Sequence, residues 1–158
     1  MQALKKLYPI PIIALLFLFP GCSRTTFDAD VDGVPMNASA AGARYDGGRL
    51  DIGYRRYEPD TAGILIEINA KGPGTFVFND DDPKTGNGAA YFPCAHSDNS
   101  NDTVFATNSH ATGTVTISGL DIEEKTVSGS FQFQASQIAP HGSKVVNIKG
   151  SFENVPLE

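Results

Sequence analysis

The residues best suited to metal chemistry are histidines and cysteines, and they are few and scattered. Cys94 and His96 are two positions apart, so in an extended strand both side chains would lie on one side, where zinc would accept them. The other histidines, His110 and His141, add no ligand pair at zinc spacing. A structural zinc site needs about four ligands in a recognisable pattern. We therefore expect surface or loop histidines, no resident metal and no cofactor.

Three consecutive aspartates, Asp80, Asp81 and Asp82, are the best candidate for a calcium-binding loop. Their spacing lacks the alternating acids, the glycine and the distal glutamate of a known calcium loop. Pro83 follows at once, which is typical of a solvated turn. The pattern favours the turn, with calcium as the alternative.

Tyr54, Arg55, Arg56 and Tyr57 combine two phenol rings with two guanidinium groups. Such a cluster could stack on a sugar or bind an acidic partner. The alternative, which we favour, is a strand end whose long polar side chains lie over the core with their charged ends in water.

Catalytic motifs are absent from the sequence. It has no Gly-x-Ser-x-Gly turn, and its glutamates fall in expected turns or on the outer faces of expected strands. We therefore expect a protein that is not an enzyme, with a hydrolase as the weakest alternative.

The N-terminal segment has the features of a signal peptide. Lys5 and Lys6 precede an apolar run over 10–19, and Pro20, Gly21 and Cys22 close it. A membrane-spanning helix would need roughly 17–25 apolar residues, and this run is shorter. We predict a signal peptide over residues 1–21.

Residues 19–22 (FPGC) resemble a lipobox, the recognition sequence of signal peptidase II. This peptidase requires a cysteine because the thiol takes a diacylglycerol before cleavage. Gly21 fits the pattern, whereas Phe19 and Pro20 depart from it, and ordinary cleavage after Ser23 is the alternative. Each buried methylene contributes about 0.8 kcal/mol, so several acyl chains would hold the protein at a bilayer. We predict lipidation of Cys22.

Lipidation of Cys22 would leave Cys94 without a partner. Cys94 is then expected to be a small buried hydrophobe at a strand end. A Cys22–Cys94 disulfide is the alternative that an exported protein allows.

The negative net charge of the chain limits the classes of binding partner. The formal charge is −6, and removing residues 1–21 takes away two lysines and no acid, which leaves 18 acidic against 10 basic residues, or −8. Such a domain does not suit nucleic acid or an anionic membrane surface. The remaining 137 residues (158 − 21) are enough for one domain with its own core.

After a short tether over 22–26, the sequence over 27–158 alternates apolar and polar residues in many segments. The clearest segments are 27–36, 50–54, 64–68, 76–78, 113–118, 127–135 and 146–153. This period of two is typical of antiparallel strands with one buried face. Asp32 and Gly33 predict a hairpin turn, and Gly129 and Gly150 on an inner face predict bulges or curvature.

No segment past residue 26 has a helical period. We therefore predict an all-β, antiparallel single domain, a β-sandwich or a partly open β-barrel of about eight to ten strands. The polar stretches 79–90 and 96–102 are expected to be loops that carry any binding site.

The chain resembles the uncharacterised small lipoproteins typical of Bacteroidota. The resemblance is carried by Cys22 and by residues 26–33 (TFDADVDG), 112–121 (TGTVTISGLD), 125–133 (KTVSGSFQF) and 147–157 (NIKGSFENVPL). It implies an all-β lipoprotein of unassigned function. Ser23 and Arg24, in place of an aspartate after the cysteine, imply the outer membrane. The absence of an acidic export signal over 23–26 implies a periplasm-facing position rather than the cell surface.

Together these observations predict a cell-envelope lipoprotein, anchored in the membrane, that is a non-catalytic binding or structural module. Its expected partner is another envelope protein or a glycan. The alternative is a lipocalin-like carrier that holds a small apolar ligand inside a barrel. An interior cavity lined by Phe76, Phe131, Phe133 and Phe152 would favour the carrier.

Overall fold

The computed structural model describes residues 24–38, 41–54, 62–78, 86–93, 104–138 and 144–158. Within these ranges every regular element is a β-strand, which confirms the predicted all-β class. The strands are β1 (Thr26–Val31), β2 (Val34–Ala38), β3 (Gly42–Asp46), β4 (Arg49–Tyr54), β5 (Gly63–Asn69), β6 (Gly74–Phe78), β7 (Gly88–Phe92), β8 (Phe105–Ala106), β9 (Gly113–Asp121), β10 (Thr126–Gln137) and β11 (Val145–Pro156). The two-residue β8 is too short to show an alternating pattern, so it was not among the predicted strands.

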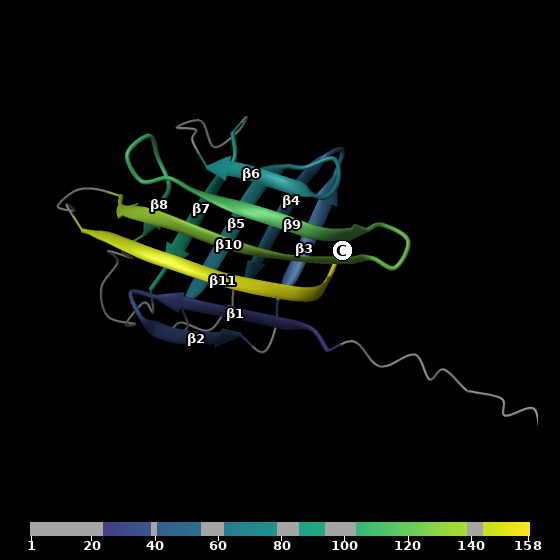
Figure 1. Ribbon diagram of the computed structural model, residues 1–158, viewed down its shortest axis with the longest axis horizontal. Helices are drawn as coiled ribbons and strands as arrows, with labels where there is room; N and C mark the ends of the chain where they lie inside the picture. The colour runs from purple at the N-terminus through teal and green to yellow at the C-terminus, as the bar shows by residue number, and fades with distance from the viewer. Residues whose placement is uncertain (1–23, 39–40, 55–61, 79–85, 94–103, 139–143) are drawn as a thin grey trace, which may run out of the picture.

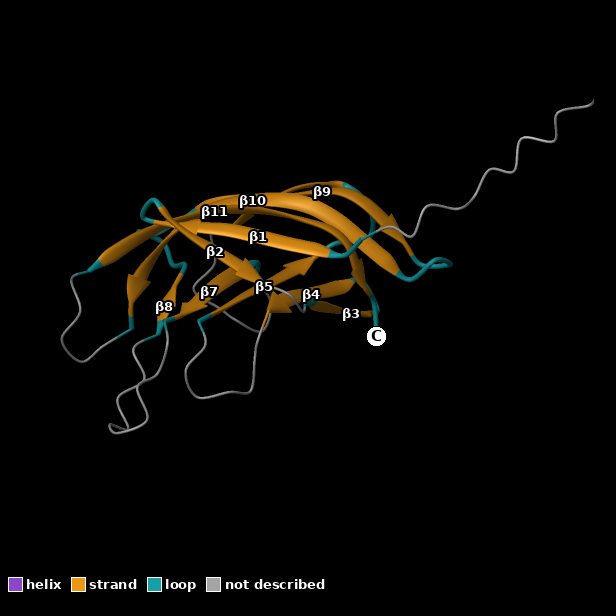
Figure 2. Ribbon diagram, turned by 90° about the horizontal axis from the view of Figure 1, so that it is seen from below, coloured by secondary structure: helices purple, strands orange, loops and turns teal. Residues whose placement is uncertain are grey.

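All eleven strands belong to one antiparallel sheet that curls into a half-barrel (Figure 2). The order is β2-β1-β11-β10-β8-β7-β5-β4-β3, and β9 and β6 extend the sheet from the other part of β10. We call β6, β9, β10, β11, β1 and β2 the front layer, and β8, β7, β5, β4 and β3 the back layer. Figure 1 shows the front layer crossing over the back layer.

Two links join the layers. The long strand β10 pairs with β9 over Thr126–Phe133 and with β8 at Ser136 and Gln137, so it belongs to both layers. At the other side, Leu157 bridges to Ala43, and the Glu158 N–H donates to the Ala43 carbonyl oxygen at 2.8 Å. The apolar inner faces of the two layers are therefore held against each other.

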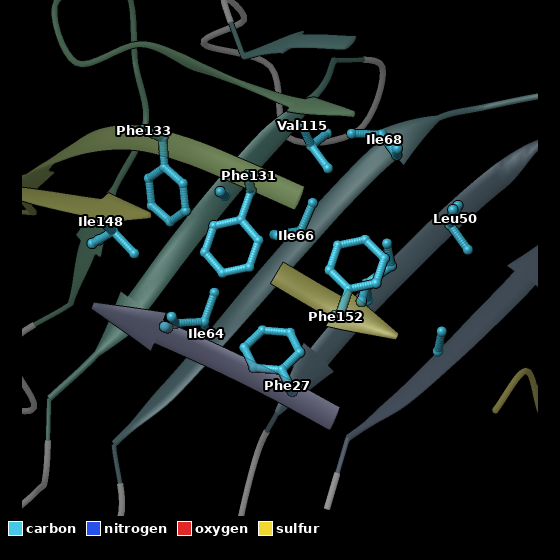
Figure 3. Packing of buried hydrophobic residues seen from close by; sticks show 14 of the residues in the cluster. Phe27, Leu50, Ile64, Ile66, Ile68, Val115, Phe131, Phe133, Ile148 and Phe152 are labelled. Carbon is cyan, nitrogen blue, oxygen red and sulfur yellow. The ribbon is translucent and has the colours of Figure 1, made fainter. Parts of the chain in front are cut away.

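The core lies between the layers and is filled by side chains from both (Figure 3). The rings of Phe27, Phe131 and Phe152 from the front layer pack with centroid separations of 5.6, 6.2 and 6.4 Å. They face the isoleucines of β5, which are 0 or 1% exposed: Ile64, Ile66 and Ile68. The alternation of buried and exposed residues predicted for β10 and β11 is confirmed.

Glycines on the inner face make room for these rings. Gly150 pairs with Phe131, and Gly129 pairs with Phe152 across β10 and β11. A Cβ at Gly150 would lie 2.5 Å from Phe131 Cζ, and one at Gly129 would lie 2.7 Å from Phe152 Cζ. Aromatic rings that cover a cross-strand glycine are a known device for curving a sheet. The register shifts at Gly129, which confirms the predicted bulge.

The predicted hairpin turn at Asp32 and Gly33 is also confirmed. The two residues connect β1 to β2 with φ of 51° and 86°. Positive φ at both central positions defines the type I′ turn, whose twist matches that of the paired strands.

The part of the chain that the structure describes contains no helix long and apolar enough to cross a membrane.

Candidate functional site

Most residues singled out in the sequence lie outside the described ranges. These are Cys22, Arg55, Arg56, Tyr57, Asp80, Asp81, Asp82, Cys94, His96 and His141. Tyr54 is the last residue of β4, where its backbone pairs with Ile64 of β5. His110 is exposed in a turn, and its N–H donates to Asn108 Oδ1 at 2.9 Å. Among the described residues, no three histidine, cysteine or acidic side chains gather in a way that would hold a metal ion.

The predicted loop over 79–90 is wrong at its C-terminal end, because β7 begins at Gly88. Gly88 and the two alanines after it have too little side chain to show a strand pattern, yet all three pair with β5, and Ala90 also pairs with Ala106 of β8. Asn87 also has a structural role. Its Oδ1 accepts from the Asn69 N–H at 2.8 Å, and its Nδ2 donates to the Val77 carbonyl oxygen at 3.3 Å.

The outer side of the front layer carries an ordered array of polar side chains. We call it the polar face. Strand register places its side chains in three rows that cross the strands. The first row holds Thr75, Thr116, Ser130, Ser151 and Asp28; the middle row holds Thr114, Gln132, Lys149 and Asp30; the turn row holds Gln134, Asn147 and Asp32.

Two open grooves lie between these rows. The first groove, about 710 Å³, lies between the first and middle rows, and its floor includes Ala29, Phe131 and Gly150. The second groove, about 630 Å³, lies between the middle and turn rows, above Phe133 and Ile148. The floors consist of residues whose side chains point into the core, so each groove is lined below by backbone and above by polar side chains.

The turn row is held by its own hydrogen bonds. Gln134 Nε2 donates to Asn147 Oδ1 at 3.1 Å, and Asn147 Nδ2 donates to Asp32 Oδ1 at 3.2 Å. The Asn147 N–H also donates to Asp32 Oδ1, at 2.8 Å. These bonds, the backbone one first, lower the pKa of Asp32, since they favour its charged form. The turn row is therefore a preformed rigid edge of the second groove.

Fewer hydrogen bonds hold the side chains of the middle row than those of the turn row. Asp30 Oδ1 accepts from the Gly33 N–H at 2.7 Å, which directs this carboxylate toward the hairpin turn. Lys149, although opposite Asp30 in register, forms no ion pair with another described residue. The Lys149 ammonium and the Gln132 amide therefore stand between the grooves with their hydrogen-bonding capacity available.

A charged cluster lies on the outer side of the back layer. Asp51 and Glu67 are cross-strand partners, and Arg49 joins them, with Nε 3.3 Å from Asp51 Oδ1 and Nη2 3.1 Å from Glu67 Oε1. Burial, and after it the charge of Glu67, raises the pKa of Asp51. The arginine compensates two carboxylates across β4 and β5, which is the role of a structural ion network.

A third hollow, of about 700 Å³, opens at the end of the half-barrel beside the β1–β2 turn. We call it the mouth. Its lining is largely apolar and includes Met36, Tyr91 and Phe105. Lys144 stands at its edge, with Nζ 6.0 Å from the Phe105 ring centroid.

Sequence reasoning missed the polar face because alternating threonine, serine and glutamine indicate only a solvated side of a strand. The hydroxyl and amide residues were visible in segments 113–118 and 127–135. Their gathering into continuous rows depends on the pairing of β9, β10, β11 and β1, which a single sequence does not show.

Comparison with known proteins gives one match. A family model described as a domain of unknown function, DUF6252, matches residues 23–156. No curated protein and no solved structure matches the chain.

Proposed function

The chain belongs to the DUF6252 family, whose function is unknown, so we propose a function from the residues of this chain. We propose that the protein is a non-catalytic binding module of the cell envelope, anchored by lipid on Cys22 at the outer membrane and facing the periplasm. The polar face is its binding surface. The observation that carries the proposal is the pair of open grooves that meet at Gln132 and Lys149, two exposed side chains with no hydrogen bond or ion pair to another described residue.

The anchor is supported by the lipobox-like residues 19–22 and by the position of the first strand. β1 begins at Thr26, and Thr25 Oγ1 donates to the Asn154 carbonyl oxygen at 3.0 Å. A lipid on Cys22 would therefore hold this end of the half-barrel close to the bilayer. The β1–β2 turn, at the other end of β1, would point away from it (Figure 1).

A binding role is supported by how the polar residues are used. Gln132, Lys149 and Ser130 are exposed on the polar face, and none carries a core contact or an ion pair in the described part of the chain. The core between the layers is complete without them. Side chains that are ordered by a sheet and not engaged by it are well placed to engage a partner.

The lipocalin-like carrier is a weaker second candidate. Phe131, Phe133 and Phe152 are at most 4% exposed and pack on one another, so an interior ligand would have to displace them. The mouth is the feature that still favours a carrier, because it is apolar with a cation at its edge. Binding of a fluorescent fatty acid that Phe105→Ala and Lys144→Gln both abolish would support it.

Mass spectrometry of the mature N-terminus tests the anchor. We expect an acylated Cys22 as the first residue and, in a Cys22→Ala chain, an unprocessed and unacylated product. A mature chain that begins at Arg24 without acyl groups would contradict the lipid anchor.

Sedimentation with isolated envelope fragments tests the binding role. The lipidated protein is added in detergent, so that retention reports the domain and not the anchor. We expect Gln132→Ala/Lys149→Ala to lower retention at least fivefold. The control, Lys71→Ala/Ser118→Ala, removes two exposed polar side chains outside both grooves and should not change retention. Equal retention of the two variants would reject the polar face as the binding surface.

A further inference from the structure

The first groove runs across the strands and not along them. Its lining comes from β9, β10, β11, β1 and β2. Neighbouring strands lie about 4.8 Å apart, so the groove extends over about 19 Å. The two rows that border it are two residues apart on each strand, or about 6.7 Å. This shape fits an extended polymer one unit wide better than a compact small molecule.

The chemistry of the lining is that of neutral hydrogen bonding. The polar residues contributed by β9 and β10 are Thr114, Thr116, Ser130 and Gln132, which carry hydroxyls and an amide without charge. Each of these groups can both donate and accept a hydrogen bond. A sugar hydroxyl has the same dual capacity, so hydroxyls along a glycan would find complementary groups on both borders of the groove.

Other polymers fit less well. A protein interface is usually centred on buried aromatic or aliphatic residues, whereas the apolar residues that register adds to the middle row, Val77 opposite Thr114 and Pro35 opposite Asp30, lie at its two ends. Nucleic acids and acidic glycans would meet Asp28 and Asp30 with only Lys149 to oppose them. The chain as a whole is acidic as well, with a formal charge of −6.

The register sets how such a ligand would lie. Thr116, Ser130, Ser151 and Asp28 form one border, one side chain from each successive strand. On the opposite border, Gln132 and Lys149 are adjacent cross-strand partners with available donors. One sugar unit has about the length of one strand spacing, so successive units would meet successive strands.

We propose that the first groove binds a neutral glycan chain laid across β9, β10, β11 and β1. The inference rests on the proposed function and names the chemical class of its partner. The groove has no aromatic platform for stacking, so one site should bind in the range of about 0.1–1 mM. Many copies anchored in one membrane would hold a long glycan by multivalency.

The test uses the lipidated protein in detergent at about 0.5 mM, a concentration near the expected Kd of one site, because detergent removes the multivalent display. Envelope fragments are used in three portions: untreated, digested with protease, and oxidised with periodate, which cleaves vicinal diols. We expect retention to survive protease and to fall at least fivefold after periodate. Because a neutral ligand offers no charge to screen, retention should change less than twofold between 50 mM and 500 mM salt. Thr116→Ala/Gln132→Ala should lose retention, and Ser118→Ala, on β9 outside the grooves, should keep it.

The outcomes separate the two proposals. Retention lost after protease but kept after periodate would overturn the glycan and leave a protein partner on the same face. Retention that falls steeply with salt would overturn the neutral ligand in favour of an anionic one. Retention that none of the polar-face variants changes would overturn the glycan and the proposed binding surface together.

Discussion

Gly150 offers the sharpest test of how the front layer is packed. An added Cβ would overlap the carbonyl oxygen of Asp28 on β1, and it would lie 2.5 Å from Phe131 Cζ and 3.0 Å from Ala29 Cα. Real side chains almost never approach so closely, so β1 or β11 would have to shift. Overpacking of a core costs about 1–3 kcal/mol, and a clash with backbone belongs at the upper end. We expect Gly150→Ala to lower the free energy of unfolding by about 3 kcal/mol.

Gly119 on β9 is the matched control. A Cβ there meets nothing within 4 Å, and its φ is not in the left-handed region. Gly119→Ala should therefore stabilise the protein by about 0.4–1 kcal/mol, because alanine restricts the unfolded chain. The two variants make the same chemical change, so any difference between them reports the local packing.

Urea unfolding followed by circular dichroism measures both variants, and the absence of tryptophan makes this signal preferable to fluorescence. With a slope of about 2 kcal/mol per molar urea, the expected difference of about 3.5 kcal/mol separates the midpoints by more than 1 M. Midpoints within about 0.3 M of each other would refute the packing of Phe131 against Gly150.

Three further predictions concern the turns and the carboxylates. Gly33→Ala should lower the free energy of unfolding by about 1–2 kcal/mol in a urea titration, because the turn holds Gly33 at φ 86° and a Cβ is disfavoured there. Asp32→Asn should destabilise the protein at pH 7 and have no effect well below pH 3.8. The pKa of Asp32 is lowered in the folded protein, so its contribution to the free energy of unfolding is present above the unfolded pKa of 3.8 and is lost as pH falls through the folded pKa. Asp51→Asn should show the opposite trend, because burial and then the charge of Glu67 raise the pKa of Asp51, so its contribution is present below 3.8 and is lost as pH rises through the folded pKa. Urea titrations at pH 3 and pH 7 in which the variant gains no stability relative to wild type would contradict the raised pKa.

The fold could be predicted from the sequence because its signals are local. Alternation on β10 and β11 identifies the buried face, and two residues, Asp32 and Gly33, specify the tight turn through their tolerance of positive φ. Even the bulge at Gly129 follows from a glycine that interrupts an apolar face. Each of these depends on neighbours within a few positions along the chain.

The site could not be predicted because its signals are not local. Ser151 lies beside Ser130 and Asp28 only through the pairing of β11 with β10 and β1, which joins residues 21 and 123 positions apart in the chain. The candidate binding residues that local motifs indicate lie elsewhere in the sequence, at the aspartates 80–82 and the arginines 55 and 56. β7 was missed in part for a related reason, since Ala89 and Ala90 carry too little side chain to show which face is buried.

The composition of the polar face is itself an argument that it is more than a solvated surface. On a sheet face that is only solvent-exposed, lysine and glutamate are suitable residues, because they keep a protein soluble and discourage pairing with further strands. On β9 and β10 the rows contain no charge at all: Thr114, Thr116, Ser130, Gln132 and Gln134 are hydroxyls and amides. These residues contribute nothing to the net charge, and the core beneath them depends on Phe131 and Phe133. What they provide is a regular array of paired donors and acceptors at the spacing of the strands. Solubility does not require that property, and recognition of a neutral polymer does.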